Sequence, residues 1–106
     1  MKKLIALGSL SLALLAASTG VLASEEYNKV PAGDRQYAQC LSYVNRIYTG
    51  GTDKSPIPRQ NKSQAWCTCM WNETPDNFRG NLAVFGESKK GKETNAICEK
   101  YADWGN

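Results

Sequence analysis

The chain has 106 residues, of which 42% are hydrophobic, and it carries 13 basic and 10 acidic side chains, four cysteines and no histidine. This length allows one domain and excludes a Rossmann enzyme, a TIM barrel or a two-domain machine. Without histidine there is no serine–histidine catalysis and no histidine-ligated metal site. This small excess of positive charge does not indicate binding to nucleic acid.

Residues 1–23 have the features of a secretory signal peptide. Lys2 and Lys3 precede a run of mostly Leu and Ala, and Val21 and Ala23 supply small residues at the positions read for cleavage. The apolar run is too short, and too interrupted by glycine and serine, to span a bilayer well. We therefore expect cleavage before Ser24 and export to a periplasm or out of the cell, with no stable membrane insertion afterwards. The mature chain would carry 11 basic and 10 acidic residues.

Residues 24–33 are polar and contain Pro31 and Gly33, which indicates a flexible N-terminal arm. A single domain over residues 34–106 follows. Asp34 is suited to cap a helix, and beyond it apolar residues recur at steps of three and four, the pattern of an amphipathic helix. We predict this helix over residues 35–49, with an apolar stripe of Tyr37, Cys40, Leu41, Val44, Ile47 and Tyr48.

Residues 50–62 form a long polar loop, GGTDKSPIPRQNK, in which Pro56 and Pro58 flank Ile57. Proline fixes φ and lacks a backbone donor, so this segment is predicted to be extended. A loop of this length in so small a domain is typically either functional or a disordered connector. As a binding loop it would offer Ile57 as an apolar anchor, with Arg59 and Lys54 as cationic contacts.

Three further helical segments follow the loop. Asn61 or Ser63 would cap a helix that runs to about Glu73, and Thr74-Pro75 is a start signal for another. In the helix after Thr74-Pro75, the apolar residues at helical spacing are Phe78, Leu82 and Phe85. Thr94 would cap the last helix, whose apolar stripe is Ile97, Cys98, Tyr101 and Trp104. The predicted fold is all-α, a small bundle of three to four short helices cross-linked by two disulfides.

The four cysteines, an even number in an exported chain, predict two disulfides. Cys67 and Cys69 diverge by about 200° on a helix, so they point to opposite sides of the middle helix and do not easily bond each other. Two pairings satisfy this: Cys40–Cys69 with Cys67–Cys98, or Cys40–Cys67 with Cys69–Cys98. We prefer the first slightly, because Cys69 shares a face with Trp66 and Met70 that the first helix could cover.

Catalytic and cofactor chemistry has little support in this sequence. The C-x-C pair of Cys67 and Cys69 follows Trp66 and superficially resembles the start of a thioredoxin-like motif, but the spacing is not C-x-x-C and the βαβ context is missing. The cysteine spacing also lacks the C-x2–4-C pairs of a zinc site. Glu99 and Asp103 form a carboxylate pair that is typical of a surface helix. We therefore expect no cofactor, no metal and no enzymatic activity.

The hypothesis that remains is recognition of a protein partner. Small size, disulfides and a proline-stiffened loop favour a non-enzymatic binding protein, most concretely an inhibitor or immunity-type factor. The alternatives are a thiol–disulfide redox protein that uses the C-x-C pair, and an envelope assembly or stress factor.

Overall fold

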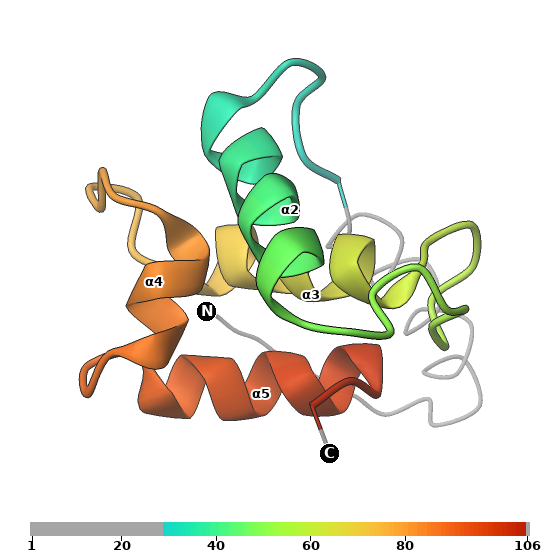
Figure 1. Ribbon diagram of the computed structural model, residues 1–106. Helices are drawn as coiled ribbons and strands as arrows, with labels where there is room; N and C mark the ends of the chain where they lie inside the picture. The colour runs from blue at the N-terminus through green and yellow to red at the C-terminus, as the bar shows by residue number, and fades with distance from the viewer. Residues whose placement is uncertain (1–28, 106) are drawn as a thin grey trace, which may run out of the picture.

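The computed structural model describes residues 29–105, and within them it contains four α-helices and no strand beyond an isolated bridge between Lys54 and Asn61. The helices are α2 (Arg35–Ile47), α3 (Lys62–Glu73), α4 (Leu82–Glu87) and α5 (Lys92–Ala102) (Figure 1). The all-α prediction is confirmed. The predicted signal peptide and residues 24–28 of the predicted arm lie outside the described residues. Residues 29–33 belong to no helix or strand.

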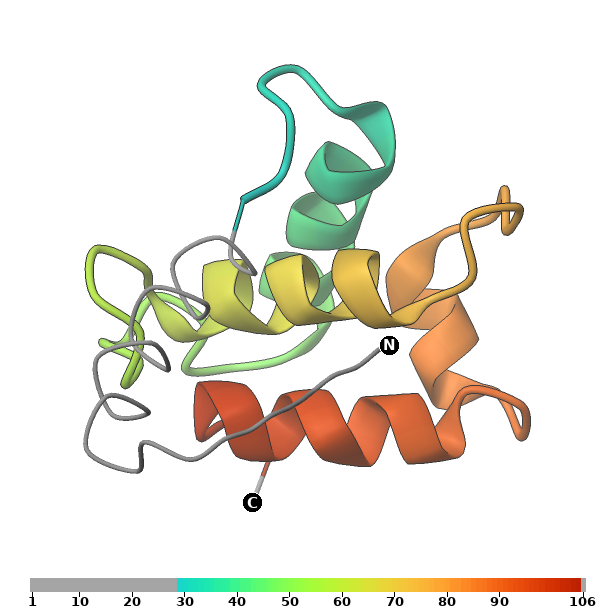
Figure 2. The ribbon, with the colours of Figure 1, turned by 180° about the vertical axis from the view of Figure 1, so that it is seen from behind.

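The middle helix, α3, is the centre of the molecule. It contacts each of the other three helices. Seven of its twelve residues are buried, including six in succession over 65–70. A helix buried on nearly all sides needs no single apolar stripe, and Ser63 and Thr68 are buried along with its apolar residues. In both ribbon views α5 runs beside α3 in the opposite direction, and α2 crosses α3. Helix α4 and the 50–62 loop lie at the two ends of α3 (Figures 1 and 2).

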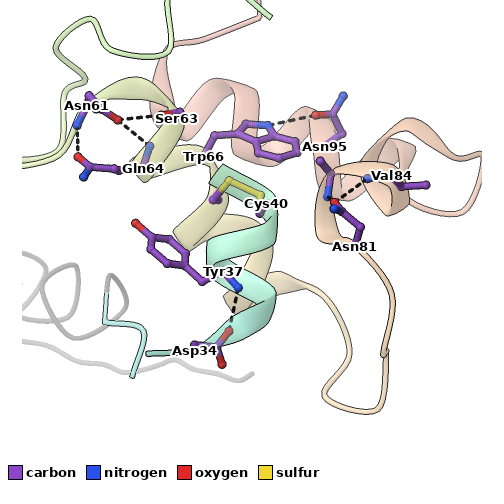
Figure 3. Close-up of a disulfide and its surroundings, with 12 residues drawn as sticks. Asp34, Tyr37, Cys40, Asn61, Ser63, Gln64, Trp66, Asn81, Val84 and Asn95 are labelled. Carbon is purple, nitrogen blue, oxygen red and sulfur yellow. Dashed lines mark hydrogen bonds between the residues drawn. A yellow bond between two sulfur atoms is a disulfide. The ribbon is translucent and has the colours of Figure 1, made fainter. Parts of the chain in front are cut away.

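Asn and Asp side chains begin three of the helices. The Asp34 carboxylate accepts from the Tyr37 backbone N–H at 2.8 Å, as its position predicts. Asn61 and Gln64 form a reciprocal capping box at the start of α3, and Asn81 caps α4 (Figure 3). Each cap satisfies backbone donors that a helix otherwise leaves unpaired. The choice between Asn61 and Ser63 is thereby settled for Asn61.

The segment after α3 differs from the sequence prediction. Thr74 ends α3, its backbone N–H bonding to the Met70 carbonyl, and it does not begin a new helix. The chain turns at residues 75–81, and α4 starts only at Leu82 because the Asn81 side chain supplies the cap. α2 ends at Ile47 instead of residue 49. α5 begins at Lys92, after Gly91, and not at a Thr94 cap.

Two disulfides join Cys40 to Cys67, with their Cα atoms 5.9 Å apart, and Cys69 to Cys98, with their Cα atoms 5.5 Å apart. The slightly preferred pairing of Cys40 with Cys69 and Cys67 with Cys98 is therefore wrong. That preference assumed that α2 covers the Trp66 and Met70 face of α3.

Helices α4 and α5 cover that face instead. The Trp66 indole N–H donates to the Asn95 side-chain oxygen on α5 at 3.1 Å (Figure 3). On α4, a Cβ built on Gly86 would lie 3.1 Å from the Met70 methyl carbon and 3.3 Å from the Trp66 ring. Cys69, on the same side of α3, consequently meets α5, whereas Cys67 meets α2.

Candidate functional site

The 50–62 loop, one of two candidate sites, is an ordered hairpin-like projection. The Lys62 N–H donates to the Asp53 carbonyl at 2.8 Å, and the buried Ser55 hydroxyl donates to the Gln60 carbonyl at 2.7 Å. The same hydroxyl accepts from the Ile57 backbone N–H at 3.0 Å. The Cys40–Cys67 disulfide holds the α3 end of the loop against α2. The loop is thus closed by its own backbone and does not match a disordered connector.

The three predicted contact residues of the loop have different environments. Ile57 is half-buried and packs against the core, so it serves mainly to fix the loop. Lys54 and Arg59 are exposed. Arg59 has a φ of 66°, in the left-handed region that costs a non-glycine residue about 1 to 2 kcal/mol. Strained backbone of this kind, held by its surroundings, is concentrated at functional sites.

The second candidate is a pocket of about 380 Å³ that residues from all four helices and from the C-terminal segment line. Its floor is buried and mostly apolar, and its rim is exposed. The floor residues are Val44, Trp66, Ala83 and Gly86; Tyr48, Thr49, Glu87 and Gly105 are exposed at the rim; and Asn95, Glu99 and Trp104 are half-buried between them.

Three of the lining residues are aromatic: Trp66 in the floor, Tyr48 at the rim and the half-buried Trp104 between them. The Trp104 ring lies at 81° to Tyr48 and at 85° to Trp66, with ring centroids 6.2 and 6.4 Å apart. These edge-to-face arrangements are favourable for aromatic pairs. The Trp104 indole N–H donates to the Thr49 carbonyl at 2.9 Å, which ties the C-terminal segment to the end of α2.

Glu87 and Glu99 are the charged residues that line the pocket within the described chain. The Glu87 carboxylate accepts from the hydroxyls of Tyr43 and Tyr48. The Tyr48 hydrogen bond to Glu87, with smaller contributions from burial and carboxylate charge, raises the pKa of Tyr48 to about 12. The same leading cause raises the pKa of Tyr43. Both phenols therefore remain protonated donors at neutral pH.

Glu99, the second carboxylate that lines the pocket, ends a chain of hydrogen bonds. The Asn95 side-chain N–H donates to Glu99 at 3.1 Å, while the Asn95 oxygen accepts from Trp66. Both ends of the Asn95 amide are thus occupied. Asp103, the other member of the predicted surface pair, is exposed and lies 4.0 Å from the Lys62 ammonium. The structure brings Glu99 into the pocket and leaves Asp103 outside it.

Sequence reasoning missed this pocket. Its residues come from segments far apart in the chain. Two local signals are present in the sequence. Val44 and Tyr48 stand four residues apart in the helix predicted over 35–49, and Asn95 and Glu99 stand four residues apart on α5, so each pair is expected to share a face. Neither signal shows that the two faces meet.

The described residues hold no free cysteine and no cluster of histidine, cysteine and carboxylate side chains that could hold a metal ion. Cys67 and Cys69 are both fully buried and are bonded to different partners. Within residues 29–105, no helix has the length and apolar character needed to cross a membrane. Comparisons with protein-family models, curated proteins and solved structures found no match to this chain.

Proposed function

We propose that this protein is a small exported, non-enzymatic binding protein that blocks a partner protein, as an inhibitor or immunity-type factor does, through the 50–62 loop. The observation that carries the proposal is the pre-formed loop, whose exposed Arg59 is held at a φ of 66°. A loop already fixed by internal hydrogen bonds and a disulfide at one end loses little conformational entropy on binding.

The chemistry of the loop favours an acidic binding surface on the partner. Lys54 and Arg59 are exposed, and arginine is prominent among residues that dominate interface energies because its planar cation pairs with carboxylates. Asp53, beside Lys54 in the chain, is exposed as well, but the two exposed cations outnumber this single carboxylate. Lys54 and Arg59 would therefore make the main electrostatic contacts with the partner.

The experiment measures affinity for the partner isolated by cross-linking in an extract of the exported compartment. We expect Arg59→Gly to weaken binding about tenfold or more, as for a hot-spot arginine. Because glycine adopts a positive φ freely, this variant keeps or slightly raises the free energy of unfolding. Loss of binding therefore reports on the side chain and not on the fold.

The matched control is Lys90→Ala, which removes an exposed cation outside the loop. It should bind as the unmodified protein does, whereas Lys54→Ala should bind more weakly. If Arg59→Gly and Lys54→Ala both keep full affinity for the partner, the loop is not the contact. Ile57→Ala is a poor probe, because this half-buried side chain supports the loop.

No observation favours the thiol–disulfide alternative, since Cys67 and Cys69 are buried and bonded to separate helices. A redox enzyme would lose activity in Cys67→Ser without loss of fold, while a structural cysteine gives a destabilised protein. An envelope assembly or stress factor differs from an inhibitor in its partners. Many different clients in the cross-linking experiment would support assembly, and one dedicated partner would support inhibition.

A further inference from the structure

We propose that the aromatic pocket between α2, α4 and α5 binds a small organic cation with a quaternary ammonium group. The pocket is lined by three aromatic residues, Tyr48, Trp66 and Trp104, and by two carboxylates, Glu87 and Glu99. This site is separate from the 50–62 loop and its proposed role does not depend on a protein partner.

Charge complementarity is the first argument for a cation. The two acidic side chains have no lysine or arginine beside them among the lining residues of the described chain. Their hydrogen bonds come from neutral donors, the tyrosine hydroxyls and the Asn95 amide, so their negative charge is not neutralised within the pocket. A cation that enters gains from two carboxylates, while an anion is repelled by both.

The arrangement of the aromatic rings is the second argument. The Trp104 ring stands at 81° to the Tyr48 ring and at 85° to the Trp66 ring, so Trp104 is not stacked flat on either of them. The negative face of an aromatic ring attracts a cation, most strongly for tryptophan, and aromatic cages are a recurrent way of binding quaternary ammonium groups. The buried apolar floor at Val44 and Ala83 would receive methyl groups.

Hydrogen bonding distinguishes a quaternary from a primary ammonium. Several polar groups that line the pocket are already paired: the Trp66 indole with Asn95, Asn95 with Glu99, and the Trp104 indole with Thr49. Glu87 and Glu99 can still accept from an ammonium group, but the floor residues Val44, Ala83 and Gly86 carry no side-chain acceptor, and an N–H donor left unpaired there is costly. A quaternary ammonium has no N–H to satisfy.

Three probes that share one shape test this assignment. Choline carries the cation alone, glycine betaine adds a carboxylate, and the neutral isostere of choline replaces nitrogen by carbon. Binding is followed by the NMR signals of the tryptophan indole N–H groups. We expect choline to shift the Trp66 and Trp104 signals but not that of Trp71, which does not line the pocket. The isostere should bind about tenfold more weakly, and betaine more weakly than choline.

Two pairs of variants assign the effect to residues. Glu99→Gln should weaken choline binding several-fold, while Glu93→Gln, an exposed change on the same helix, should not. Trp104→Ala should abolish the Trp66 shift, and Trp104→Phe should restore part of it. Equal binding of choline and its isostere would overturn the charge selectivity. The absence of any choline-induced shift at Trp66 and Trp104 would overturn the site itself.

Discussion

At the scale of single residues, Tyr48 and Glu87 show how the rim of the pocket is held. The Tyr48 hydroxyl, just beyond the end of α2, donates to the Glu87 carboxylate of α4, and the hydroxyl of Tyr43, five residues earlier on α2, donates to the same carboxylate. Two phenols on one carboxylate fix the separation of α2 and α4 at the mouth of the pocket. Ionisation of either phenol would replace a donated hydrogen bond by repulsion between two negative charges.

The raised pKa of Tyr48 leads to a prediction at high pH. Its value moves from 10.0 to about 12, chiefly through the hydrogen bond to Glu87. A raised folded-state pKa contributes stability that is complete below pH 10 and is lost as pH rises toward 12. We expect Glu87→Gln to return the Tyr48 pKa toward 10.0, measured by NMR titration of the ring carbons. The control is Glu93→Gln, which should leave the Tyr48 pKa unchanged. If Glu87→Gln also leaves it unchanged, the hydrogen bond to Glu87 is not the cause of the raised pKa.

At the scale of elements, the short connection between α4 and α5 depends on Gly91. Its backbone N–H donates to the Ser88 carbonyl at 3.2 Å, which folds the chain tightly from one helix into the next. A Cβ at this position would lie 1.9 Å from the Phe85 carbonyl oxygen and 2.6 Å from its carbon. The obstacle is backbone and cannot rotate away. The turn that brings α5 against α4 therefore tolerates only glycine.

We expect Gly91→Ala to lower the free energy of unfolding by about 2 to 3 kcal/mol, as overpacking against a fixed neighbour does. Denaturant unfolding measures the change. Gly33→Ala is the control, because its φ of 82° brings backbone strain but its Cβ would meet nothing within 4 Å. That variant should cost only about 1 kcal/mol. Equal losses in the two variants would show that contact with Phe85 is not what restricts Gly91.

The sequence predicts elements well where caps and periodicity agree. Asp34 and the apolar stripe after it locate α2, and Asn61 with Gln64 locates the start of α3. The prediction fails at Thr74-Pro75, where a valid start signal is overruled by a turn and by the stronger cap at Asn81. Local signals cannot rank two competing starts, since the choice depends on how α4 packs against Trp66 and Met70.

At the scale of the whole molecule, the disulfides link the three longer helices in sequence. The bonded cysteines are 27 and 29 positions apart in the sequence, and the chain-entropy estimate for loops of this length is about 3.5 kcal/mol each. That is a large share of the stability of a small domain. The described core holds few large aliphatic side chains, with Val44, Met70 and Leu82 the largest that are fully buried. We therefore expect the reduced protein to unfold.

Paired cysteine substitutions test both the stabilisation and the connectivity. Cys40→Ser with Cys67→Ser should leave one intact disulfide, no free thiol and a protein destabilised by about 3.5 kcal/mol. Cys40→Ser with Cys69→Ser removes the same number of cysteines, but it leaves Cys67 and Cys98 without their partners and facing different sides of α3. Alkylation and intact mass should then find two free thiols. One disulfide and no free thiol in this second variant would contradict the observed pairing.

The fold class and the participation of all four cysteines follow from the sequence, but the pairing and the pocket do not. A C-x-C pair on a helix buried all round is consistent with either pairing until the covering helices are placed. The loop was identified by its prolines, and Arg59 was singled out without any sign of its backbone conformation. The pocket needs four helices and the C-terminal segment together, so no local pattern reveals it.

The disulfide connectivity divides the chain into two covalent rings in series. One ring closes residues 40–67, the other closes residues 69–98, and Thr68 alone separates them. Because the rings share no segment, neither has to thread or open for the other to form. A chain oxidised from its N-terminal side onward can close the first ring before Cys98 is present, by joining consecutive cysteines in order. With an oxidant present, the native connectivity can therefore form in chain order without the reshuffling of a mispaired bond.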